Sequence, residues 1–174
     1  MSASTAKSAP CLGFLTVVEE ASLGLTGGYL LLNAAARPLE FHCTAPVKAS
    51  RTQEILYGPT LKPYLYGEQL AETLVSKSKA RPIVVLTDCP PVLAARSLIE
   101  IPLLLVLDGA AGFEAASGFA LAKSRVTTAP AYAGDEQAVL AVWPHEADQF
   151  DLREPFDRIR QAIEEAQKGA RQAA

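Results

Sequence analysis

Histidine and cysteine side chains are few in this sequence, and their spacing limits the chemistry they could do. The chain has two histidines and three cysteines: His42, His145, Cys11, Cys43 and Cys89. Neighbouring residues of a strand point to opposite faces, so His42 and Cys43 cannot both bind one ion there. No CxxC or HxxxH spacing accompanies them, and no turn typical of an enzymatic nucleophile is present. We therefore expect buried, inert cysteines rather than a zinc site, a disulfide scaffold or a cysteine nucleophile.

A glycine-rich segment, Asp108–Gly112, follows a predicted strand, where phosphate-binding loops often lie. It matches neither the dinucleotide-binding pattern GxGxxG nor the P-loop pattern. Its acidic neighbourhood would also repel phosphate. The segment therefore does not predict a nucleotide site.

Tyrosines form the most distinctive local cluster. Residues 56–61 and 65–70 resemble each other, and three of the five tyrosines lie in this region: Tyr57, Tyr64 and Tyr66. A tyrosine combines apolar area with a polar tip, which suits a protein interface or a base-stacking platform. We predict these three as binding residues. The alternative is that their rings pack the first helix onto a sheet.

The elements that position these residues change in character near residue 50. Three stretches, 12–19, 29–32 and 39–44, are rich in apolar residues and separated by turns, which predicts an antiparallel meander. Ser50 with Gln53 forms a capping box, which predicts a helix from there. Gly58-Pro59 must break this helix before a second helical stretch.

The second half of the chain follows a strand–helix–strand order. Two all-apolar runs, Ile83–Leu86 and Pro102–Leu107, predict strands buried on both faces. A helix at 91–100 between them predicts parallel pairing. Segment 108–124 fits a helix or a mobile loop, and 125–128 and 139–143 fit short strands or loops. A final helix, capped by Asp151 with Phe150 as a staple, has one apolar face: Leu152, Phe156, Ile159, Ile163 and Ala166.

Together these elements predict an α/β fold in a single domain, residues 11–168. Its mixed sheet has three antiparallel strands followed by parallel strands, with flanking helices. Residues 1–10 and 169–174 are expected to be disordered tails.

Composition and charge are those of an ordinary globular domain. The 174 residues are 49% hydrophobic and 20% charged, with a net charge of −3. No basic stripe attracts nucleic acid or anionic lipid, and the acidic excess lies within 101–150. The first apolar run ends at Glu19 and Glu20, too early for a signal peptide, and no run approaches a membrane span. We expect a cytoplasmic protein without membrane association.

The order of elements resembles the ribonuclease H-like fold, most closely over residues 12–108. Proteins of that family carry carboxylates in the first strand, the first helix, the end of the fourth strand and a late helix, and these hold two divalent metal ions for phosphodiester cleavage. The matching positions are Glu19 in VVEE, Glu54 in RTQEI and Asp88 in VVLTD. The Gly27-Gly28-Tyr29 turn also matches. The resemblance implies that Glu19, Glu54 and Asp88 are catalytic and that Mg²⁺ is the cofactor.

The chain departs from the family pattern in its carboxylates. The first is Glu where the family normally has Asp, and the late-helix carboxylate could be Asp148, Asp151 or Asp157. Outside the family pattern, Glu19, Glu54 and Asp88 would simply be surface and turn charges. The residues that would hold a metal are therefore left unknown.

Two functions remain open from the sequence. The incomplete catalytic set, the lack of a cofactor motif and the tyrosine cluster favour a non-catalytic module, without cofactor, that binds protein partners or itself as a homo-oligomer. The alternative is a divalent-metal-dependent nuclease of ribonuclease H-like type that acts on nucleic acid. Convergence of Glu19, Glu54 and Asp88 at one end of the sheet would favour the nuclease.

Overall fold

The computed structural model describes residues 8–108 and 118–173, and these contain one mixed sheet in the order β3-β2-β1-β4-β5-β7-β6. Strands β1 (Cys11–Glu20), β2 (Gly24–Asn33) and β3 (Pro38–Cys43) form the antiparallel meander. Strands β4 (Val84–Thr87) and β5 (Leu103–Val106) continue the sheet in parallel with β1. Two short antiparallel strands complete it: β6 (Phe119–Leu121) and β7 (Ser124–Thr128).

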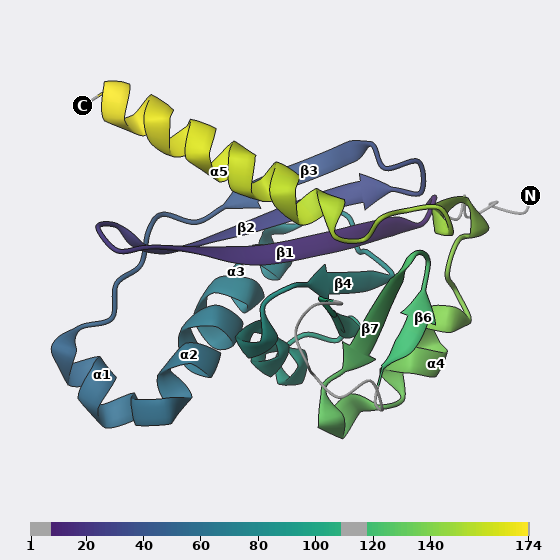
Figure 1. Ribbon diagram of the computed structural model, residues 1–174, viewed down its shortest axis with the longest axis horizontal. Helices are drawn as coiled ribbons and strands as arrows, with labels where there is room; N and C mark the ends of the chain where they lie inside the picture. Colours follow the sequence, from purple (N-terminus) through teal and green to yellow (C-terminus); the bar gives the residue numbers. More distant parts are fainter. Residues whose placement is uncertain (1–7, 109–117, 174) are drawn as a thin grey trace, which may run out of the picture.

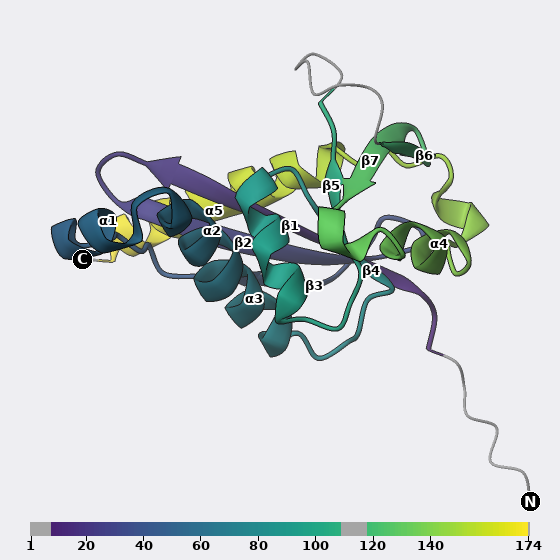
Figure 2. The same cartoon turned by 90° about the horizontal axis from the view of Figure 1, so that it is seen from below.

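Helices cover both faces of this sheet (Figures 1 and 2). The long helix α5 (Glu154–Gln172) lies along one face, across β1 and β2. The other face is covered by the succession that follows β3 and by the segment between β4 and β5. The elements that cover it are α2 (Leu61–Pro63), η2 (Tyr64–Ala71), α3 (Glu72–Lys77) and η3 (Pro90–Ser97). Helix α1 (Arg51–Tyr57) and the turn η1 (Gly58–Thr60) precede them and bury no residue against the sheet. Shorter helical turns follow β7: η4 (Pro130–Tyr132), α4 (Asp135–Leu140) and η5 (His145–Ala147).

Two apolar cores form because successive strand residues point to opposite faces. On β1, Leu15 and Val17 pack toward α3 and η2, while Leu12 and Phe14 pack toward α5. The ring of Phe14 meets that of Phe156 edge to face, with centroids 5.8 Å apart. Of the predicted apolar face of the last helix, Phe156, Ile159 and Ile163 are on α5 and buried, whereas Ala166 is exposed. Leu152 is also buried, but it precedes the helix.

A glycine brings α5 close to the sheet. A Cβ atom on Gly28 of β2 would clash with Ile159, and it would come within 2.9 Å of Ile163. The absence of a side chain at Gly28 therefore lets Ile159 and Ile163 pack directly on the backbone of β2.

The predicted α/β fold class is confirmed, including its parallel centre. Val85 pairs with Leu103 and Thr87 with Leu105, so the two all-apolar runs are adjacent parallel strands. The residues of β4 and β5 are at most 5% exposed, as expected for strands covered on both faces. The capping box is also confirmed, because the side chain of Ser50 accepts from the Gln53 amide and that of Gln53 accepts from the Ser50 amide.

Several element boundaries differ from the prediction. The segment expected as a helix at 91–100 is the 3₁₀ helix η3, which starts at Pro90. Segment 139–143 was expected as a short strand or a loop, but its first two residues belong to α4, which ends at Leu140. Helix α5 begins at Glu154, since Asp151 forms a separate turn by accepting from the Arg153 amide.

The chain ends also differ from expectation or lie outside the description. Helix α5 continues to Gln172, within the range expected as a C-terminal tail. Most of the expected N-terminal tail and part of segment 108–124 lie outside the described residues. In the described ranges, no helix is both long and apolar enough to cross a membrane.

A buried ion pair ties η3, α4 and β5 together. The Arg96 guanidinium donates two hydrogen bonds to Asp135, at 2.7 and 3.0 Å, and it lies over the ring of Tyr132. Asp135 also accepts from the amide of Leu103 at the start of β5. The hydrogen bonds from Arg96 to Asp135 raise the pKa of the guanidinium, so Arg96 stays charged. This pair fixes the segment that follows Asp88.

Candidate functional site

Asp88 lies at the carboxyl end of β4, beside the middle of β1. The parallel register pairs Leu15 with Thr87, so the next residues, Thr16 and Asp88, are also neighbours. The fully buried Thr16 hydroxyl donates to Asp88 Oδ1 at 2.6 Å. This bond orients the carboxylate on a rigid strand end. In open α/β sheets, ligands commonly bind beyond the carboxyl ends of parallel strands.

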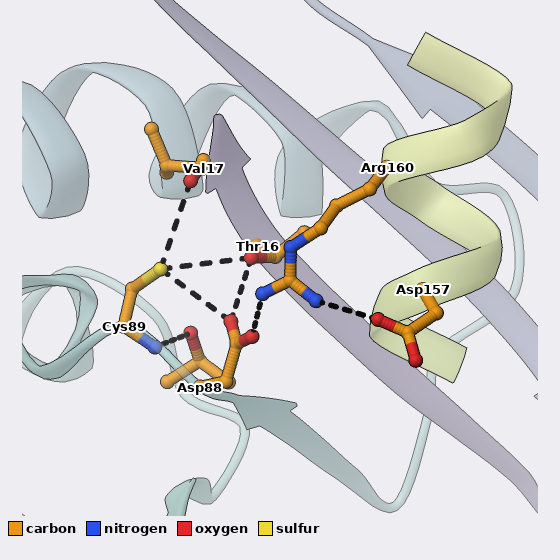
Figure 3. A network of polar contacts seen from close by, with 7 residues as sticks. Thr16, Val17, Asp88, Cys89, Asp157 and Arg160 are labelled. Carbon is orange, nitrogen blue, oxygen red and sulfur yellow. Dashed lines mark hydrogen bonds and ion pairs between the residues drawn. The ribbon is translucent and has the colours of Figure 1, made fainter. Parts of the chain in front are cut away.

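Arg160 of α5 reaches the same carboxylate (Figure 3). One terminal nitrogen of its guanidinium donates to Asp88 Oδ2, and the other donates to Asp157 Oδ1 at 3.1 Å. Burial acts to lower the pKa of Arg160, but the charges of Asp88 and Asp157 outweigh it, so the pKa is raised. A permanent cation therefore sits between carboxylates from β4 and α5.

A second aspartate follows the neighbouring strand. Asp108 comes after β5 as Asp88 comes after β4, and the two strands are adjacent and parallel, so both residues lie at the same edge. Arg153, just before α5, donates to Asp108 Oδ1 at 2.7 Å. Both members of this pair are about half exposed.

Two hollows lie between α5 and this edge of the sheet, and we call them together the α5 groove. One has a volume of about 380 Å³ and is lined by Asp88, Pro90, Leu105, Val106, Leu107, Asp108, Arg153, Phe156, Asp157 and Arg160. The other, of about 410 Å³, is lined by Val17, Val18, Glu19, Glu20, Arg160, Ile163, Glu164 and Gln167. Arg160 borders both hollows. Among the described residues, six carboxylates and two arginines line the groove, so its charge is negative.

Cys89 and Tyr66 do not line the two hollows, but each lies near one of the acidic side chains there. The Cys89 sulfur lies 3.6 Å from the Thr16 hydroxyl and 3.4 Å from Asp88 Oδ1. Burial, followed by the charge of Asp88, raises the pKa of the Cys89 thiol, so it stays protonated and is a poor nucleophile. Burial and then the charge of Glu19 raise the pKa of Tyr66.

The other cysteines and histidines lie apart from this groove. Cys11 is buried as expected, but Cys43 is exposed at the end of β3, which corrects the expectation that the cysteines are buried. His42 pairs with Glu40, at 2.9 Å, and His145 pairs with Asp148 at an exposed turn.

The structure brings two of the three carboxylates predicted from the sequence to the groove. Asp88 and Glu19 line its two hollows, on either side of Arg160. Glu54 lies on α1, is exposed, and pairs with Arg51 at 3.0 Å. The β1 residue beside Asp88 is Thr16, three positions before Glu19.

The sequence left three candidates for the late-helix carboxylate, and of these Asp157 lines the groove. Asp148 instead accepts from the Trp143 indole, and Asp151 accepts from the Arg153 amide. The roles of Arg160 and Thr16 were missed because each depends on the register between distant segments. The spacing of Asp157, Arg160 and Glu164 on one side of α5 was the available signal.

The predicted tyrosine cluster divides in two. Tyr57 and Tyr64 stack on each other, with ring centroids 4.4 Å apart and an interplanar angle of 21°. Tyr66 is buried, as in the core-packing alternative. A binding role for Tyr57, Tyr64 and Tyr66 stays a prediction.

The acidic side chains of the groove bear on whether the protein could hold a divalent ion. Within the described residues, no three His, Cys, Asp or Glu side chains form a group that could hold a metal ion, so an all-protein cage is absent. Mg²⁺, however, is commonly bound by one or two carboxylates together with water and substrate phosphate. Asp88 and Asp157 already share one cation, the Arg160 guanidinium, which shows that this place suits positive charge.

Comparison with known proteins gives similarity at the level of the fold. No family model matches the chain, and no curated protein matches it. Human endonuclease V is similar over 92% of this chain and 87% of its own, with a TM-score of 0.49 and 12% identity. An endonuclease V variant from Ciona intestinalis, in complex with inosine-containing DNA, is similar with a TM-score of 0.40 and 12% identity. This chain spans 46% of the length of the Ciona protein, and the match covers 57% of this chain.

These neighbours correct one interpretation of the sequence. A non-catalytic module that binds protein partners or itself was the leading interpretation, and the solved structures similar to this chain are nucleases instead. Of the resemblance to ribonuclease H-like proteins, the α/β fold with a mixed sheet is shown.

Proposed function

We propose that this protein is a divalent-metal-dependent nuclease of ribonuclease H-like type, with its active site in the α5 groove. The observation that carries the proposal is the placement of Asp88 and Asp157 on either side of one guanidinium. Two carboxylates from different elements that share a cation beside an open hollow form a donor set suited to Mg²⁺.

The two carboxylates have different degrees of freedom. Asp88 is fixed by the Thr16 hydroxyl at the end of a buried strand, and its side chain is 22% exposed. Asp157 is 71% exposed on the first turns of α5 and can adjust its position. We assign both as metal ligands, with Asp108 as a further acidic residue of the same hollow. When bound, the ion supplies Lewis-acid polarisation of a phosphoryl oxygen and activation of a water.

The charge of the groove supports dependence on a divalent ion. Carboxylates outnumber arginines among the described residues that line it, so a polyanion meets repulsion there. Each divalent ion that binds there reduces this repulsion. Arg153 and Arg160 then present planar, forked donors of the kind that bind phosphate in two places at once.

The three cysteines bear on the cellular compartment of the protein. Cys11, Cys43 and Cys89 are free thiols. Free thiols persist in a reducing environment, and we propose a cytoplasmic location on that ground.

The test is cleavage of labelled single-stranded DNA, duplex DNA, single-stranded RNA and RNA–DNA hybrid in Mg²⁺ or Mn²⁺. We expect cleavage of at least one substrate, abolished by EDTA. The variants Asp88→Asn and Asp157→Asn should lose about 100-fold or more of the rate, because each removes a metal ligand. Glu165→Gln, on the same helix and outside the groove, is the matched control and should retain the rate.

Thermal unfolding of each variant separates loss of the site from loss of the fold. Glu54→Gln tests whether Glu54, which the ribonuclease H-like resemblance implied as catalytic, takes part in cleavage. We expect this variant to retain activity, because Glu54 lies on α1 and not in the groove. Absence of cleavage of every substrate, or cleavage that survives EDTA or Asp88→Asn, would refute the proposal.

A further inference from the structure

We infer that Arg160 has two partners in turn: the Asp88–Asp157 pair when no divalent ion is bound, and a substrate phosphate once an ion occupies that pair. This inference rests on the nuclease function proposed above and names its phosphate-binding residue.

The first step is that Arg160 and an ion would compete for the same oxygens. The guanidinium already bonds Asp88 Oδ2 and Asp157 Oδ1, so a divalent ion on these carboxylates meets both an occupied acceptor and a nearby positive charge. Like charges a few ångströms apart in a half-buried site repel strongly, enough to weaken ion binding by roughly tenfold or more. The ion-free protein is therefore held in a state of low ion affinity.

The second step is that Arg160 can leave without disturbing the fold. Both of its contacts are made by the two terminal nitrogens, at the end of a long flexible side chain. The helix itself is anchored by neighbouring Ile159 and Ile163, which are buried against the sheet. Side-chain rotation alone can move the guanidinium, while α5 stays in place.

The third step is that the released guanidinium is already beside the groove. Arg160 borders both hollows, and its side chain is 43% exposed between them. Once the carboxylates are neutralised by an ion, the guanidinium is complementary in charge and geometry to a phosphodiester. The substrate phosphate would then lie beside the ion, with Arg160 as its second contact.

The first measurement is a Mn²⁺ titration without nucleic acid, followed by the electron paramagnetic resonance signal of free Mn²⁺. Arg160→Gln should bind Mn²⁺ about tenfold or more tightly than the wild-type protein. Arg158→Gln is the matched control, because it removes the same charge from the same helix, where Arg158 bonds Glu154 and the carbonyl of Ala36 outside the groove. The control should leave Mn²⁺ affinity unchanged.

The second measurement is the affinity of a labelled oligonucleotide, read by fluorescence anisotropy in Ca²⁺. Here Arg160→Gln should bind about tenfold more weakly, whereas Arg158→Gln should bind as the wild type does. If Arg160→Gln does not fold, Arg160→Lys serves instead, since it keeps the charge and loses the fork. It should show wild-type Mn²⁺ affinity and weakened oligonucleotide binding.

The two proposals fail in different ways. Unchanged or weaker Mn²⁺ binding by Arg160→Gln, or unchanged oligonucleotide binding, overturns the role of Arg160 even if the wild-type protein cleaves nucleic acid. Tighter Mn²⁺ binding together with weaker oligonucleotide binding supports it, and absence of cleavage in that case overturns only the nuclease function.

Discussion

The buried ion pair between Arg96 and Asp135 offers a quantitative test of how the segment after Asp88 is held. We predict that Asp135→Ala destabilises the protein by about 3–5 kcal/mol, the usual cost of leaving a buried charge without its partner. The side chains of Arg96 and Asp135 are only 16% and 8% exposed, so solvent screens them little. Two unit charges about 4 Å apart interact by about 4 kcal/mol at the effective dielectric of such sites, which agrees with that range.

The assay is urea denaturation of the purified variants at neutral pH. Arg96 keeps a hydrogen bond to the Ile99 carbonyl, at 2.8 Å, and its contact with the Tyr132 ring, so we expect the lower half of the range. Glu165→Ala is the control, since its pair with Lys168 is exposed and screened by solvent, so the free energy of unfolding should stay close to that of the wild type. A cost below about 1 kcal/mol for Asp135→Ala would refute the reasoning. The double variant Arg96→Met/Asp135→Leu should recover much of the loss, because it leaves no buried charge.

Three further predictions concern the core, the site and an acid-sensitive contact. Phe156→Ala should cost about 3–5 kcal/mol in the same denaturation assay, because Phe156 is 1% exposed and packs against Phe14; a change within about 0.5 kcal/mol would mean that α5 is not anchored there. Thr16→Val should lower Mn²⁺ affinity by about 10–100-fold, because it removes the bond that orients Asp88, and unchanged affinity would exclude a positioning role. Hydrogen bonds from His42 and from the Ala80 and Lys79 amides lower the pKa of Glu40 from 4.5 to about 2. Its carboxylate therefore stabilises the fold above pH 4.5, and this contribution is lost as the pH falls from 4.5 toward 2. Thermal unfolding of Glu40→Gln should differ from wild type at pH 6 and converge with it near pH 2, and a constant difference would contradict the assignment.

The central strands of the sheet were predictable because their apolar patterns lie within short stretches of the sequence. The runs Ile83–Leu86 and Pro102–Leu107 are apolar throughout, and short runs of this kind are typical of strands covered on both faces. The capping box at Ser50 is a contact between residues three apart, so it too can be read from the sequence.

Helix type and helix ends were less predictable, because small energy differences decide them. The segment after Cys89 starts with two prolines and becomes a 3₁₀ helix, although its composition also suits an α-helix. Asp151 has the residue type of a helix cap, yet it caps a separate turn and α5 starts three residues later.

The site was only partly predictable, because its contacts join distant parts of the chain. Asp88 was identified at a strand end, but its partner Arg160 is 72 residues away and depends on how α5 lies on the sheet. Thr16 faces Asp88 only through the register of β1 and β4, whereas the sequence pattern pointed to Glu19. No spacing rule applied to one segment at a time could reveal these pairs.

The most direct measurement of the proposed function is the initial rate of oligonucleotide cleavage in Mg²⁺ by wild-type protein and Asp88→Asn, purified in parallel. We predict a wild-type rate that EDTA abolishes and an Asp88→Asn rate about 100-fold or more lower, with the variant still folded in thermal unfolding. Equal rates for the two proteins, or no cleavage by the wild-type protein, would contradict a nuclease site at Asp88.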